Sequence, residues 1–136
     1  MRLPRRALIG LCLVLTAVGL TGCSNSQDTA ASARASHFDR ALASKDAAAA
    51  CADLAAKARQ SLEQEEGKPC VRVILDQHLP TPSGNSRVRT YGSAAQVRHS
   101  GDTAFLSRYD SGWLITGVGC KPTGHGEPYD CTIEVG

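Results

Sequence analysis

Between residues 31 and 66, apolar residues recur at helical spacing. One face is formed by residues at intervals of four, three and four: Ala31, Ala35, Phe38 and Leu42. This periodicity predicts a helix over Ala31–Ala43. The alanine-dense segment Ala47–Ala58 predicts a second helix, with Asp46 as its N-cap. A third helix, Arg59–Glu66, is expected to end at Gly67.

The segment from residue 70 to residue 79 carries two conflicting patterns. Its β-branched residues favour a strand. Positions 71, 74, 75 and 78 instead lie on one helical face, and Pro69 suits a first helical turn. We expect a short helix, with a strand as the alternative, followed by a loop over Pro80–Asn85.

The remainder of the chain alternates between apolar and polar positions, which is typical of β-strands. The expected strands are Arg87–His99, Thr103–Tyr109, Trp113–Cys120 and Tyr129–Val135. Gly92 divides the first into two stretches and indicates a bulge or bend. Ser100-Gly101 predicts a tight turn and Asp110-Ser111-Gly112 a hairpin loop. Helices followed by an antiparallel meander of about four strands predict one α+β domain over residues 31–136.

The N-terminus has the pattern of an export signal. A basic start is followed by an apolar run, and the sixteen residues from Ala7 to Gly22 span about 24 Å as a helix, against about 30 Å of hydrocarbon. Leu20-Thr21-Gly22-Cys23 resembles the lipobox of bacterial lipoproteins. The resemblance implies that residues 1–22 are a signal peptide and that Cys23 becomes the lipid-bearing first residue.

Residues 23–30 are then expected to be a lipid-bearing tether, since they are small and polar. The expected location is the extracytoplasmic face of the cell membrane, with the membrane as a partner through the lipid. An ordinary secreted protein, or a chain held by an uncleaved signal, is the alternative.

The cysteines support export. Cys12 lies in the apolar run and Cys23 in the lipobox, which leaves four of the six. Four cysteines in an exported domain predict two disulfides with three possible pairings. We favour the two sequence-local pairs: Cys51–Cys70 and Cys120–Cys131. A zinc site is not expected, because no C-x-x-C motif or suitably spaced histidine is present.

The charge of the mature chain is nearly balanced. Residues 1–22 hold three arginines and no acidic residue, so 12 basic and 13 acidic side chains remain. This balance gives no support to nucleic-acid binding. Four arginines alternate along the expected strands and indicate a solvated face: Arg87, Arg89, Arg98 and Arg108.

Several short motifs resemble a group of small, largely uncharacterised lipoproteins and secreted proteins of high-GC Gram-positive bacteria. These motifs are Phe105-Leu106, Gly112-Trp113, Gly119-Cys120 and Pro128-Tyr129-Asp130-Cys131, together with Cys51 and Pro69-Cys70. The resemblance runs from about Ala31 to the end. The order of elements is similar to the cone-shaped nuclear transport factor 2-like superfamily, which implies helices packed on a curved sheet. That superfamily contains isomerases, dehydratases, cyclases and binding modules, so it implies no single activity.

Candidate ligand-facing residues are few. They are His78, His99, Tyr91 and Trp113, although a histidine beside a turn is usually at the surface and a tryptophan usually packs. Nucleophile-elbow, phosphate-loop and dinucleotide motifs are absent, so no catalytic residue is assigned and no cofactor is expected.

The sequence therefore favours a non-catalytic, lipid-anchored module that binds a small apolar ligand or an envelope protein. The alternative is an acid–base enzyme of the isomerase or cyclase type. That alternative requires titratable groups that converge on the interior. Exposed and scattered positions for His78, His99 and Asp76 would argue against it.

Overall fold

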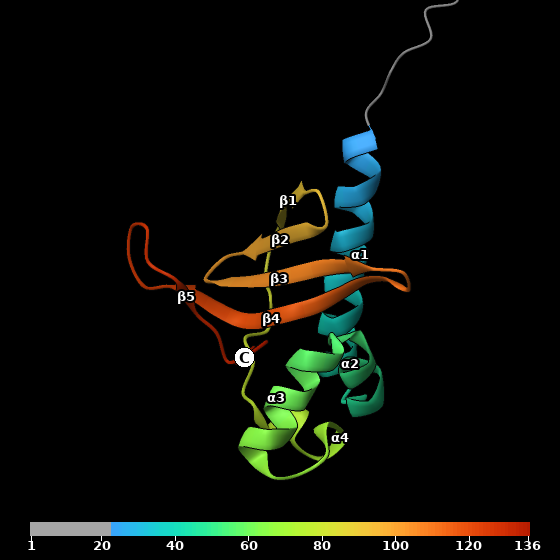
Figure 1. The fold of residues 1–136 in the computed structure, drawn as a ribbon, viewed down its shortest axis with the longest axis vertical. Helices are drawn as coiled ribbons and strands as arrows, with labels where there is room; N and C mark the ends of the chain where they lie inside the picture. Colours follow the sequence, from blue (N-terminus) through green and yellow to red (C-terminus); the bar gives the residue numbers. More distant parts are fainter. Residues whose placement is uncertain (1–22) are drawn as a thin grey trace, which may run out of the picture.

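A computed structural model of the protein describes residues 23–136, and the signal expected at residues 1–22 lies outside this range. The helices are α1 (Cys23–Ala43), α2 (Ala47–Asp53), α3 (Ala56–Glu66), α4 (Cys70–Val73) and the 3-10 turn η1 (Ile74–Asp76). The strands are β1 (Arg87–Tyr91), β2 (Ala94–His99), β3 (Asp102–Tyr109), β4 (Gly112–Pro122), β5 (Tyr129–Asp130) and β6 (Ile133–Glu134). The predicted α+β class is confirmed (Figure 1).

Helix α1 begins eight residues earlier than the apolar periodicity predicted. It starts at Cys23, so residues 23–30, which were expected to be a tether, form the first part of a helix instead. Gln27 and Asp28 explain the extension, because each bonds to a strand. Gln27 accepts a hydrogen bond from Trp113 at 3.1 Å, and Asp28 accepts one from Thr90 at 2.8 Å.

The expected single helix over Ala47–Ala58 is interrupted at Leu54 and Ala55. Leu54 has extended backbone angles and forms a bridge with Ile115 of β4. Ala55 donates its backbone N–H to the carbonyl of Ile115 at 2.7 Å. Leu54 and Ala55 are therefore bonded to the sheet, although helix propensity alone predicts that they continue the helix.

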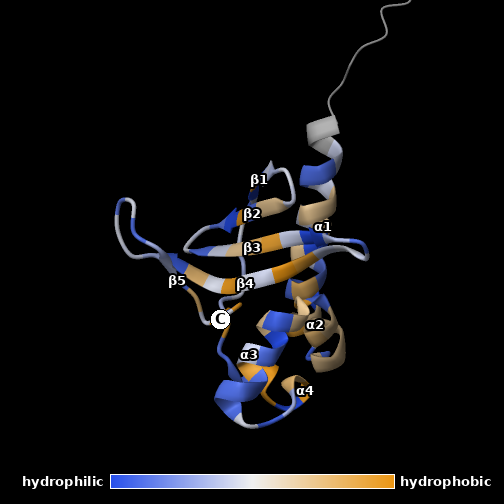
Figure 2. Cartoon of the chain, viewed as in Figure 1, coloured by the Kyte–Doolittle hydropathy of each residue, from blue (hydrophilic) through white to orange (hydrophobic). Residues whose placement is uncertain are grey.

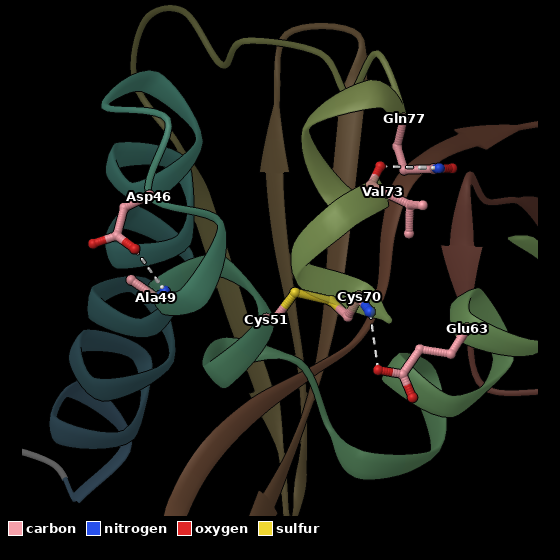
Figure 3. Close-up of a disulfide and its surroundings, with 7 residues drawn as sticks. All are labelled: Asp46, Ala49, Cys51, Glu63, Cys70, Val73 and Gln77. Atoms are coloured by element: carbon pink, nitrogen blue, oxygen red, sulfur yellow. Dashed lines mark hydrogen bonds between the residues drawn. A yellow bond between two sulfur atoms is a disulfide. The ribbon is translucent and has the colours of Figure 1, made fainter. Parts of the chain in front are cut away.

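The first disulfide joins α2 to α4, as Figure 3 shows. Cys51 and Cys70 are bonded, and the Cys70 N–H donates to Glu63 at 2.9 Å. The predicted N-cap is confirmed, since Asp46 accepts a hydrogen bond from the Ala49 N–H at 3.0 Å. Residues 70–76 are helical, which settles the helix–strand ambiguity in favour of the helix.

The sheet is antiparallel, with the order β1-β2-β3-β4-β5 and with β6 also paired to β4. It has six strands rather than four. Gly92 lies in the turn between β1 and β2, not at a bulge, and its φ of 60° suits a tight turn. The expected last strand is split into β5 and β6, because Cys131 lies between them and is bonded to Cys120.

Helices and strands share one core. Ala31, Ala35 and Phe38 of α1 are buried in the same cluster as apolar residues of the strands. Those from the sheet include Val97, Leu106, Trp113, Ile115 and Ile133. In Figure 1, α1 runs behind β3 and β4, and α2–α4 lie at the opposite end of the molecule from the start of α1. Figure 2 shows the apolar positions of β3 and β4 alternating with polar ones.

Candidate functional site

Three titratable side chains meet where α1 passes the β2–β3 turn. Asp39 lies on α1, His99 ends β2 and Asp102 begins β3. His99 and Asp102 are cross-strand partners on either side of the tight Ser100-Gly101 turn, which confirms that turn. His99 Nε2 lies 3.9 Å from Asp39 Oδ2, with 10% and 25% of the two side chains exposed. We call these three residues the Asp39 cluster.

Burial governs the protonation of the Asp39 cluster. Desolvation raises the pKa of Asp39 to about 6, nearby His99 opposes this rise, and Asp102 adds to it. Burial also raises the pKa of Asp102, against the backbone N–H of Thr103. His99 Nδ1 and Asp102 Oδ1 are buried without a hydrogen-bond partner among the described residues. A proton can therefore be exchanged at this cluster near neutral pH.

A small cavity opens beside Asp39. Its volume is about 140 Å³, and its wall is formed by Asp39, His78 and apolar or loop residues: Leu42, Ala43, Ile74, Leu75, Leu79, Pro80, Thr81 and Pro82. His78 itself is exposed and has a φ of 50°. Typical ligand pockets measure roughly 300–1,000 Å³. This cavity can admit only a few atoms.

A second polar cluster surrounds Asp53 of α2, which is only 1% exposed. Arg34 donates to one of its oxygens, and His37 Nδ1 lies 2.5 Å from the other. Arg34 and His37 both lie on α1, so their contacts with Asp53 join α1 to α2. Beside it an open groove of about 520 Å³ runs along α1 to Trp113.

The four residues that the sequence suggested as ligand-facing do not gather in one place. His78 lines the small cavity and His99 belongs to the Asp39 cluster. Tyr91 is 61% exposed at the end of β1, whereas Trp113 is 4% exposed and packs in the core. Asp76 is exposed and lies outside the lining of the cavity.

Sequence reasoning missed the polar residues that the structure brings together. Asp39 and Asp102 are 63 positions apart in the sequence, and neither stands in a motif. The available signals were weak. Asp39 directly follows the buried Phe38, and Asp53 is the only acidic residue within the alanine-dense segment Ala47–Ala58.

No group of histidine, cysteine, aspartate and glutamate residues suited to a metal ion occurs within residues 23–136. None of the helices described there is long and apolar enough to cross a membrane. Comparison with protein-family models, curated proteins and solved structures gives no match for this chain. Function must therefore be argued from the geometry of the described residues.

Proposed function

We propose that this protein is a lipid-anchored extracytoplasmic module that binds an envelope protein through its surface, without catalysis. The observation that carries this proposal is the filled interior. Phe38, Leu106 and Ile115 are at most 1% exposed, and the cavity beside Asp39 holds about 140 Å³. A small apolar ligand of ordinary size would not fit there. We therefore infer that binding takes place on the outer surfaces, where the groove beside Asp53 measures about 520 Å³.

Two features support the location. The two disulfides are of the kind that persists in an oxidising compartment outside the cytosol. Helix α1 begins at Cys23, the residue that would carry the lipid, and it is bonded to the sheet through Gln27 and Asp28. A lipid at Cys23 would thus be joined to the domain by a continuous helix.

We also propose that the domain has the cone-like architecture of the nuclear transport factor 2-like superfamily. The order of elements supports it, with four helices before the antiparallel sheet. The burial of apolar α1 residues in the same core as β2, β3 and β4 residues also supports it.

The Asp39 cluster favours one alternative, an acid–base enzyme. A general acid or base works best when its pKa is near the working pH, and burial brings that of Asp39 to about 6. His99 could exchange a proton with it at 3.9 Å after a small movement. The cavity would restrict the substrate to a very small molecule or to the end of a larger one.

Native mass spectrometry of protein released gently from its own membranes tests both readings. A retained protein partner supports the proposed module. A small molecule retained by Asp39→Asn but not by the unchanged chain or by the exposed control Asp76→Asn would instead indicate turnover. Membrane fractionation of Cys23→Ala tests the anchor, because loss of the thiol removes the site of lipid attachment.

A further inference from the structure

Three arginines share one face of the first two strands. Arg87 and Arg89 are exposed and alternate along β1, and Arg87 pairs directly with the exposed Arg98 of β2. Directly opposite residues on one face have Cβ atoms about 5 Å apart, and diagonal neighbours are about 7–8 Å apart. None of the three makes an ion pair with another residue of the described chain.

Like charges placed opposite one another across a ladder oppose folding. Charge on an edge strand can prevent pairing with other chains, and β1 is an edge strand. That role does not account for Arg98, because β2 is paired on both sides. A negatively charged partner outside the chain accounts for all three arginines.

The position of the β1–β2 hairpin relative to α1 indicates the partner. Asp28 bonds to Thr90, so the start of α1 lies beside β1, on the opposite face of the strand from Arg89 and Tyr91. Cys23 and Asp28 are five positions apart on α1, a rise of about 7.5 Å. Figure 1 shows the β1–β2 hairpin toward the end of the molecule where α1 starts, far from α3 and α4.

Tyr91 adds a residue suited to a lipid interface. It is 61% exposed at the tip of β1, and tyrosine is enriched at the level of lipid headgroups. The far end of the molecule has mixed charge instead. Its exposed or half-buried charged residues on and around α3 and α4 are Lys57, Arg59, Glu63, Glu65, Glu66, Lys68 and Arg72.

We propose that Arg87, Arg89 and Arg98, with Tyr91, form a basic face that lies against anionic phospholipid headgroups. The proposal rests on the proposed anchoring at Cys23. The guanidinium groups bind lipid phosphates, and the exposed tyrosine ring enters the headgroup layer. The anchor keeps the chain at the membrane, and the basic face sets its orientation, so that the face of the β1–β2 hairpin opposite α1 is turned toward the lipid.

The test uses the lipidated full chain in vesicles of phosphatidylcholine, with or without phosphatidylglycerol. Exposed arginines are labelled with phenylglyoxal and quantified by mass spectrometry. We expect phosphatidylglycerol to suppress labelling of the three arginines of the basic face. Labelling of Arg59 and Arg72 should not change. At about 1 M salt, where the Debye length is about 3 Å, the protection should be lost.

Two variants test whether the arginines of the basic face act together in the labelling experiment. Arg89→Gln should reduce the protection of the two remaining arginines of the face, whereas the matched change Arg72→Gln should not. Equal labelling in the two kinds of vesicle, in a chain that floats with both, would overturn this inference alone. A chain that floats with neither would overturn the anchoring, and this inference with it.

Discussion

Trp113 donates its indole N–H to Gln27 at 3.1 Å, which ties the buried tryptophan of β4 to the first turns of α1. The two residues are 86 positions apart in the sequence. Gln27 lies one helical turn after Cys23, the proposed site of lipid attachment. This bond therefore holds the helix that would carry the proposed anchor against the sheet.

Gln27→Ala should lower the free energy of unfolding by about 1–2 kcal/mol, because the Trp113 N–H loses its partner in a partly buried setting. Urea unfolding measures the effect. Gln64→Ala, at an exposed position of α3, is the matched control and should change little. Equal stability of the two variants would show that the bond does not stabilise the domain.

The Cys51–Cys70 disulfide closes a sequence separation of 19 residues, so Cys51→Ala with Cys70→Ala should cost about 3 kcal/mol. The pair Cys120→Ala and Cys131→Ala, with a separation of 11, should cost slightly less. Urea unfolding with and without reductant measures both. Four reactive thiols in residues 24–136 of the denatured, unreduced protein would contradict the two bridges.

The sequence was a good guide where structure depends on near neighbours. The cap at Asp46, the end of α3 at Gly67 and the Ser100-Gly101 turn all follow from local chemistry. The local cysteine pairs were also predicted correctly.

Long-range contacts explain the errors. Polar residues 24–30 have no apolar stripe, and their helix is joined to the sheet by bonds to Thr90 and Trp113. Ala55 leaves the helix because its N–H bonds to Ile115. The Asp39 cluster was missed for the same reason, since α1 and the β2–β3 turn meet only in the folded chain.

Asp39→Asn tests the pH dependence of the Asp39 cluster. Burial raises the pKa of Asp39 from 3.8 to about 6, so between these values the folded state binds more protons than the unfolded state. The free energy of unfolding of the unchanged protein should therefore fall as pH rises through this range. Asparagine removes this effect, so the variant should be the more stable protein near pH 7, by up to about 3 kcal/mol.

That advantage should shrink as the pH falls from about 6 to 3.8, and it should be lost below 3.8, where Asp39 becomes protonated in both the folded and the unfolded states of the unchanged chain. Denaturant unfolding across the pH range measures the difference, with the exposed Asp76→Asn as control. A difference between Asp39→Asn and the unchanged chain that stays constant with pH would refute the raised pKa.

Arg34→Met should destabilise the domain by about 2 kcal/mol. Asp53 is 1% exposed and would keep only His37 as a partner for its buried charge. This loss of unfolding free energy is smaller than the loss expected for a fully buried ion pair, because 31% of the Arg34 side chain is exposed. Arg59→Met, on an exposed position of α3, should have almost no effect in the same thermal or urea unfolding experiment.

The intact mass of the protein extracted from its own membranes tests whether Cys23 is the lipid-bearing first residue. We expect a chain that begins at Cys23 and carries a diacylglyceryl group on that residue, with the four remaining cysteines oxidised. The N-terminal proteolytic peptide should locate the lipid. A chain that retains residues 1–22, or one that begins elsewhere and has no lipid on Cys23, would rule out the lipid anchor.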